Sequence, residues 1–134
     1  MDGVIALNSE FATASGAVCT YRPAEPDLMI YADEGQISQI LINLIKNALQ
    51  AGAKHIDISA RMGDDDEVVV QVANDGEPIP AAAQEQIFIP FYTTKKEGSG
   101  IGLSISRQIM RNHNGSIELL RSNARETVFE LRFR

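Results

Sequence analysis

The stretch DEGQISQILINLIKNALQAG, residues 33–52, decides the fold of this chain. Apolar side chains recur in it every three or four residues, which predicts one amphipathic helix packed on a core. Asp33 is placed to cap the start of this helix and Gly52 to end it. The apolar stripe consists of Ile37, Ile40, Leu41, Leu44, Ile45, Ala48 and Leu49.

Four amide side chains follow the same helix beside the stripe. They fall at positions i, i+7, i+11 and i+14, and they are Gln36, Asn43, Asn47 and Gln50. An amide oxygen is a suitable ligand for magnesium, which takes one or two protein groups and completes its shell with waters and phosphate oxygens. The amides equally suit the solvated face of an amphipathic helix. The helix by itself leaves both interpretations open.

Short strands and two further helices are expected around the long helix. Alternating or β-rich segments predict strands at 15–22, 28–32, 55–61 and 68–73 and two closing strands, the last alternating from Thr127 to Phe133. Helices are expected from Ala81 to Phe88 and from Leu103 to Asn112, the second ending near Gly115. The fold class is therefore α+β, a two-layer α/β sandwich of a mixed sheet and about three helices.

Composition narrows the classes of function. With 134 residues, 44% of them hydrophobic, the chain suits one compact domain. Its net charge of -6 disfavours a nucleic-acid surface. Cys19 is the only cysteine, so neither an intrachain disulfide nor a thiolate zinc site is expected. Without an apolar run of about 18 residues, we expect a cytoplasmic domain that makes no membrane contact.

Two glycine-containing segments and a long loop suggest a phosphate site. The segment VANDGEPIP, residues 72–80, follows a strand where backbone can approach a ligand closely. The segment GSGIGL, residues 98–103, enters a helix whose free N–H groups favour phosphate. Lys95 and Lys96 precede it and could neutralise phosphate charge. Residues 88–102 lack periodicity and form an unusually long loop.

In their order along the chain, these segments resemble the Bergerat ATP-binding fold of histidine kinases, DNA gyrase, MutL and the large heat-shock chaperones. The segment NLIKNA, residues 43–48, looks like the asparagine motif of that family. The segment FIPFYTTK, residues 88–95, looks like the phenylalanine box of the kinases, and residues 98–103 look like the second glycine box. The resemblance covers about residues 28–134 and implies ATP and Mg²⁺ as cofactors.

The resemblance also implies roles for individual residues. Asn47 is expected to bind magnesium and Asn43 to assist at the phosphates, which makes these two the catalytic positions. Thr127 is expected near the adenine. The loop from Phe91 to Gly102 is expected to be the mobile ATP lid, and its part from Tyr92 to Ser99 to be poorly ordered without nucleotide. The remaining nucleotide contacts implied are Gln50, Asn74, Gly76, Ile79, Phe91, Thr93, Thr94, Lys95, Gly98, Gly100, Ile101, Gly102 and Leu103.

The chain departs from the family pattern at two positions. The family's first glycine box begins with an aspartate that accepts a hydrogen bond from adenine, and the aligned residue here is Asn74. Asn74 still offers a neutral acceptor, and Asp75 is the alternative. Gln50 stands where many histidine kinases carry a lysine or arginine, a charge that Lys95 or Lys96 could replace.

Within the family, the helix favours a kinase over a hydrolase. The hydrolase branch has a water-activating glutamate at the position of Asn43, and an amide cannot act as a general base. His55 is expected in a strand and His113 in a turn, so neither resembles a phosphate acceptor. We therefore expect residues 15–134 to be a catalytic domain that phosphorylates a histidine on a separate dimerisation hairpin, with residues 1–14 as the connection.

The implied parent is a homodimeric sensor kinase that signals to a response regulator, and its membrane anchoring is left open. Two other functions stay open at this point. One is a nucleotide-binding or docking module with little kinase activity, because the first glycine box is altered. The other is a serine kinase of the anti-sigma type, against which the segment 88–95 argues.

Overall fold

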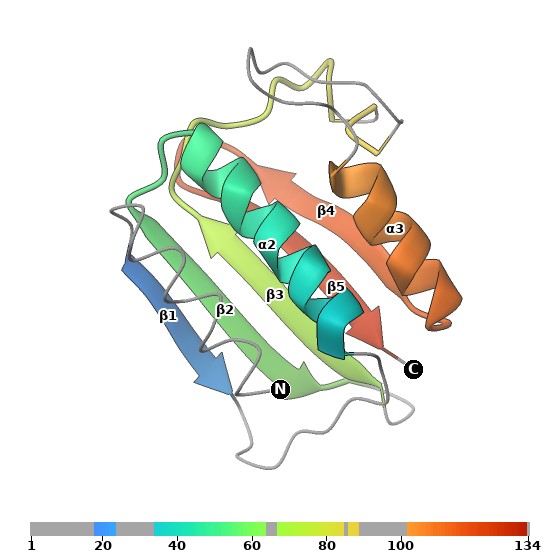
Figure 1. The fold of residues 1–134 in the computed structure, drawn as a ribbon. Coiled ribbons are helices and arrows are strands. Elements are labelled where there is room, and N and C mark those ends of the chain that lie inside the picture. The colour runs from blue at the N-terminus through green and yellow to red at the C-terminus, as the bar shows by residue number, and fades with distance from the viewer. Residues whose placement is uncertain (1–17, 24–33, 64–66, 85, 89–101, 134) are drawn as a thin grey trace.

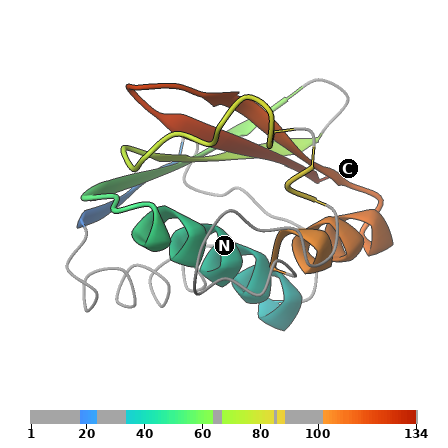
Figure 2. The ribbon, with the colours of Figure 1, turned by 90° about the horizontal axis from the view of Figure 1, so that it is seen from above.

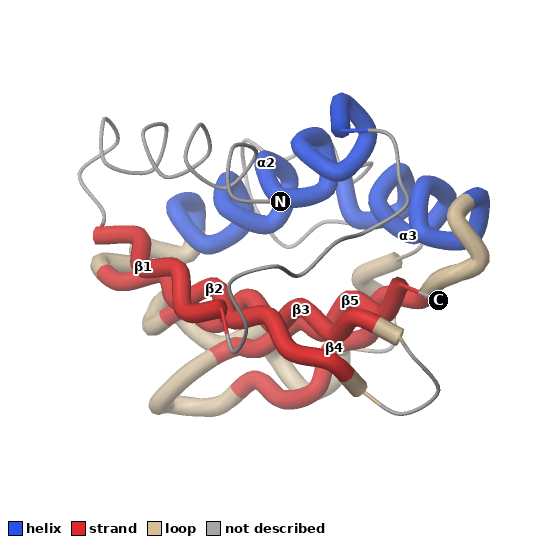
Figure 3. The backbone as a smooth tube through the Cα atoms, turned by 90° about the horizontal axis from the view of Figure 1, so that it is seen from below, coloured by secondary structure: helices blue, strands red, loops and turns tan. Residues whose placement is uncertain are grey.

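The computed structural model describes residues 18–23, 34–63, 67–84, 86–88 and 102–133. These residues form one five-stranded sheet with two α-helices on a single face of it (Figures 1, 2 and 3). The elements are β1 (Val18–Pro23), α2 (Glu34–Gln50), β2 (His55–Met62), β3 (Val68–Asn74), α3 (Gly102–Asn112), β4 (Ser116–Ser122) and β5 (Thr127–Phe133). The expected two-layer α+β sandwich is confirmed.

The sheet is mixed and has the strand order β1-β2-β3-β5-β4. β1 runs parallel to β2, and the other neighbouring pairs are antiparallel. Because β3 and β5 are antiparallel, the last residue of β3, Asn74, lies opposite the first residue of β5, Thr127. Two residues that are far apart in the sequence are thereby brought to the same end of the sheet.

The helix α2 packs its apolar stripe on the centre of the sheet, as the periodicity predicts. Ile40, Leu41 and Ile45 are fully buried. The helix stops after Gln50, and Gly52 in the following turn has a φ of 79°, which side-chain-bearing residues rarely adopt. Ala53 N donates to Ala48 O at 3.0 Å, which completes a glycine-terminated helix end. The predicted span and stop of this helix are confirmed.

The helix α3 ends in a similar turn, with an asparagine in the left-handed conformation. Asn114 has a φ of 59°, and Gly115 N donates to Met110 O at 2.8 Å. Gly115 is required for a different reason. A Cβ atom there would lie 2.2 Å from Arg132 O in β5, so no side chain fits between the helix end and the sheet.

The helix expected from Ala81 is not formed in the described residues. Residues 81–84 and 86–88 are turns, in which Ala83 N donates to Pro80 O and Gln86 N donates to Ala83 O. These bonds span three residues, and a short segment with few buried side chains does not sustain an α-helix. The described residues therefore contain two α-helices where about three were expected. The strand expected at 28–32 and the Asp33 cap lie outside the described residues.

Both faces of β5 are buried. Phe129, Leu131 and Phe133 point into the core beneath the helices, as the alternation predicts. On the other face Glu130 is only 5% exposed, because it accepts hydrogen bonds from Gln71 at 2.9 Å and from Arg132 at 2.7 Å. These two bonds satisfy the buried carboxylate of Glu130 on the face of the sheet without helices. Among the described residues, no helix is long and apolar enough to cross a membrane.

Candidate functional site

Five element ends lie at one end of the sheet. In Figure 1 the end of α2, the end of β3 and the start of α3 lie together there, beside the end of β4 and the start of β5. The predicted site residues Asn74, Gly76, Gly102 and Thr127 belong to these ends. The topology therefore gathers segments from the whole chain into one candidate site.

Asn43 links the two helices on the helix side of the site. Its Nδ2 donates to Ser106 Oγ of α3 at 3.1 Å, and its Oδ1 accepts from Gln39 Nε2 at 3.0 Å. Ser106 is fully buried. These two bonds set the orientation of the Asn43 amide. Sequence reasoning missed Ser106, although a serine on the apolar face of a helix, between Leu103 and Met110, is a usable signal.

Asn47 lies one helical turn after Asn43 and is half-buried, while Gln50 is exposed at the last residue of α2. No group of three or more histidine, cysteine or acidic side chains that could hold a metal occurs among the described residues. A magnesium ion here would have to use a neutral amide oxygen together with its own waters and phosphate oxygens, in place of the carboxylates that more often hold it. The half-buried Asn47 amide fits that requirement.

The first glycine segment is docked onto the end of α2. Glu77 N donates to Ala51 O at 2.8 Å. A Cβ atom on Gly76 would lie 2.9 Å from Ala51 Cβ, so the turn and the helix end approach too closely for a side chain. Asn74 is 8% exposed, and its Oδ1 accepts from Gly76 N at 2.9 Å. The backbone of this segment was expected to approach a ligand closely. In the structure it closely approaches Ala51, after the end of α2.

Thr127 belongs to a chain of hydrogen bonds on the sheet side of the site. It is buried, and its Oγ1 lies 2.7 Å from Ser122 Oγ at the end of β4. Ser122 Oγ also accepts from Ile79 N at 2.8 Å. The predicted residues Ile79 and Thr127 are thus joined through Ser122, which sequence reasoning missed. Its pairing with Thr127 follows from the β4–β5 register and could be found only once that hairpin was aligned.

Asp75 is held at the corner between α2 and β2. Its carboxylate accepts from the backbone N of Lys54 at 2.8 Å and of His55 at 2.9 Å, and it lies 2.8 Å from His55 Nδ1. The hydrogen bond from the His55 backbone is the main reason that the pKa of Asp75 falls to about 2. Asp75 is therefore engaged away from Asn74.

The two histidines lie where the sequence pattern predicts them. His55 opens β2 and its side chain is 67% exposed. His113 lies in the turn after α3, where its Nδ1 is 2.8 Å from Ile109 O. Neither side chain lies on a helix.

The start of the phenylalanine segment is anchored between β5 and α3. The Phe88 ring packs edge-on against Phe129, with 6.4 Å between centroids, and Arg107 lies 5.9 Å above the Phe88 ring. Leu103 packs against the core, and Gly102 is the first residue of α3. Outside the described residues lie the expected lid and the site residues Phe91, Thr93, Thr94, Lys95, Gly98, Gly100 and Ile101, together with Lys96.

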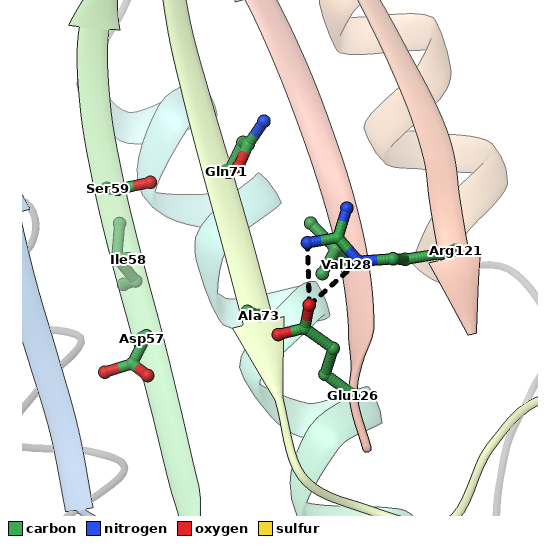
Figure 4. A pocket seen from close by; sticks show the side chains of 8 residues that line it. All are labelled: Asp57, Ile58, Ser59, Gln71, Ala73, Arg121, Glu126 and Val128. Atoms are coloured by element: carbon green, nitrogen blue, oxygen red, sulfur yellow. Dashed lines mark hydrogen bonds and ion pairs between the residues drawn. The ribbon is translucent and has the colours of Figure 1, made fainter. Parts of the chain in front are cut away.

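A hollow of about 220 Å³ opens on the face of the sheet without helices (Figure 4). Polar side chains surround it, and its rim carries an ion pair of 2.6 Å between Arg121 and Glu126. The lining residues are Asp57, Ile58, Ser59, Gln71, Ala73, Arg121, Glu126 and Val128. None of the predicted site residues is among them, so this hollow is not the predicted site.

Comparison with known proteins identifies the family. Residues 32–134 match the family described as histidine kinase-, DNA gyrase B-, and HSP90-like ATPase. Sensor histidine kinase ZraS of Escherichia coli (strain K12) is 35% identical over 103 residues, which is 76% of this chain and 22% of that protein. Sporulation kinase A of Bacillus subtilis (strain 168) is 34% identical over 134 residues, which is 97% of this chain. The chain spans 22% of the length of each of these relatives.

Solved structures agree with the sequence relatives. The catalytic domain of histidine kinase ThkA superposes with a TM-score of 0.81 at 35% identity, over 98% of this chain and 88% of that one. Full-length ShkA in complex with AMPPNP gives a TM-score of 0.83 at 27% identity and covers 98% of this chain and 28% of that one. The chain therefore belongs to the histidine kinase-, DNA gyrase B- and HSP90-like ATPase family, as an ATP-binding domain of the histidine kinase type.

Proposed function

We propose that this chain binds MgATP at the gathered element ends and transfers the γ-phosphate to a histidine on a separate helical hairpin. The observation that carries the proposal is the hydrogen bond from Asn43 to Ser106. It joins the amide-bearing helix α2 to α3, the helix that begins at Gly102, so that the Asn43 amide is held in a fixed position relative to α3. Phosphoryl transfer depends mainly on such positioning and on neutralised charge.

Four of the predicted residues have specific roles in this proposal, namely Asn43, Asn47, Asn74 and Thr127. Asn47 holds magnesium through its amide oxygen, and Asn43 contacts the phosphates from the neighbouring turn of α2. The start of α3 offers backbone N–H groups to phosphate oxygens. Magnesium, when bound, would neutralise charge on the transferred phosphate. The base lies at the sheet side, near Asn74 and Thr127. The complex of full-length ShkA with AMPPNP supports a nucleoside triphosphate as the ligand.

The acceptor belongs to another part of the parent protein. His55 lies in a strand and His113 in a turn, while the proposed acceptor histidine lies on a helical hairpin. Asn43 cannot activate water as a carboxylate would, so ATP should be hydrolysed only slowly. We therefore assign residues 15–134 to the catalytic domain and residues 1–14 to its connection with the hairpin. The parent would be a homodimer that passes phosphate to a response regulator.

Transfer of labelled phosphate tests the proposal directly. The chain is incubated with γ-labelled ATP and magnesium, with and without the hairpin of its parent protein. We expect the label on the hairpin and none on the chain. A hairpin whose histidine is replaced by glutamine is the control and should stay unlabelled. Nucleotide binding without any transfer would favour the docking module, and stable labelling of His55 or His113 would contradict the assignment.

A further inference from the structure

Neutral side chains surround the position where β3 ends. Asn74 contributes an amide, and Thr127 lies opposite it in the sheet with Ser122 hydrogen-bonded behind it. An amide and a hydroxyl can each donate or accept a hydrogen bond, whereas a carboxylate at neutral pH only accepts. These two side chains can therefore pair with either a hydrogen-bond donor or an acceptor of a ligand.

Three carboxylates near the end of β3 are engaged elsewhere. Asp75 accepts from the backbone of Lys54 and His55 at the α2–β2 corner. Glu126 is paired with Arg121 at 2.6 Å, beside the hollow on the face without helices (Figure 4). Glu130 is paired with Arg132 at 2.7 Å on that same face. None of these three pairings involves Asn74, which lies opposite Thr127 at the end of β3.

The orientation of the Asn74 amide follows from its own hydrogen bond. Its Oδ1 accepts the buried N–H of Gly76 at 2.9 Å. No buried side-chain nitrogen or oxygen of the described residues lacks a partner, so the Nδ2 group, which has no hydrogen bond of its own, is at least partly exposed. The group that Asn74 presents to a ligand is thus an N–H donor beside a carbonyl lone pair.

We infer that Asn74 relaxes the choice of base, so that this chain binds purine nucleotides with a 6-oxo group about as well as ATP. The inference rests on the proposed nucleotide site. A carboxylate at residue 74 would accept from the 6-amino group of adenine and repel a 6-oxo group. With Nδ2 toward position 6, the amide can donate to the 6-oxo oxygen and accept from the adjacent N1–H of that base. With the amide turned over, it can accept from the 6-amino group of adenine and donate to N1.

Inosine triphosphate is the deciding probe. Its base differs from adenine at position 6 and in the proton on N1, and it lacks the extra amino group of guanine. Calorimetry with magnesium should give dissociation constants for ATP and ITP that agree within about tenfold. A preference for ATP greater than tenfold in the unaltered chain would overturn the inference, whatever any variant does.

The substitution Asn74→Asp should restore discrimination. We expect ITP to bind about tenfold to hundredfold more weakly to this variant, while ATP binds at least as tightly as before. The control is Asn123→Asp, which adds the same charge in the β4–β5 turn. Asn123 Oδ1 accepts from the backbone of Arg125 and Glu126, and a carboxylate keeps both bonds. The control should leave the ATP-to-ITP ratio unchanged.

The outcomes separate the inference from the proposed function. Equal weakening of ATP and ITP in Asn74→Asp would show that residue 74 does not read position 6, and would overturn the inference alone. Circular dichroism on each variant establishes that it is folded before its binding is compared. If neither nucleotide binds the folded, unaltered chain, the proposed function fails and the inference fails with it.

Discussion

The two sides of the candidate site are held together by different kinds of hydrogen bond. On the helix side, side chains bond to side chains, from Gln39 to Asn43 and from Asn43 to Ser106. On the sheet side, the Ser122 and Thr127 side chains also bond to each other, but two bonds come from the backbone. Gly76 N donates to Asn74, and Ile79 N donates to Ser122. Substitutions on the helix side should therefore change the contacting amides directly. On the sheet side they should change the path of the backbone.

Asn47→Ala tests the helix side where we expect the largest effect. Loss of the amide oxygen should remove the magnesium-dependent part of ATP binding and lower the rate of phosphotransfer by about a hundredfold or more. Binding of ATP without magnesium should change little, because the sheet side is intact. Calorimetry with and without magnesium measures both. The control is Asn112→Ala, on the exposed end of α3. If magnesium affects ATP binding in Asn47→Ala as it does in the unaltered chain, the assignment of Asn47 to the magnesium site is wrong.

Ser106→Ala should slow phosphotransfer to an intermediate extent, because it removes the hydrogen bond that orients Asn43. The variant leaves Asn43 Nδ2 without its buried acceptor, so we expect phosphotransfer to slow by about tenfold and the free energy of unfolding to fall by about 1 kcal/mol. A double-mutant cycle with Asn43→Ala isolates the bond. Ser106→Ala should slow transfer further by less than twofold in the Asn43→Ala background. Fully additive effects would show that the two residues act independently.

Asp75→Asn should have the smallest effect, on stability and not on the site. The carboxylate is 39% exposed and solvent screens it, so we expect a loss of about 1 kcal/mol at pH 7 in urea unfolding. Folding lowers the pKa of Asp75 from 3.8 to about 2, so its stabilisation is present above pH 3.8 and is lost as the pH falls toward 2.

The stability difference between the unaltered chain and Asp75→Asn should accordingly shrink as the pH falls from about 5 to 2. Asp57→Asn, an exposed position on β2, controls for the lost charge. Affinity for ATP should stay within about twofold, because Asp75 faces the α2–β2 corner and not Asn74. A large loss of ATP affinity would show that Asp75 belongs to the nucleotide site after all.

Local patterns in the sequence determined the elements and the family. The spacing of Ile37 to Leu49 predicted α2, because a period of 3.6 residues can bury only one face of a helix. Gly52 predicted its end, because the left-handed conformation there disfavours a side chain. The order of the asparagine, phenylalanine and glycine segments predicted the family. A helix was predicted at 81–88 because alanine and glutamine favour helices, but a segment this short does not sustain a helix by propensity alone.

Only the tertiary structure decided which polar groups meet. Ser106 lies 63 residues from Asn43 in the sequence, and Ser122 lies 43 residues from Ile79. Whether Asn74 or Asp75 faces the site depended on backbone N–H groups at Lys54 and His55, which the sequence does not place. Spacing along a chain specifies neighbours on one helix or strand. Contacts between elements follow from strand register and helix packing, which form only when the whole core assembles.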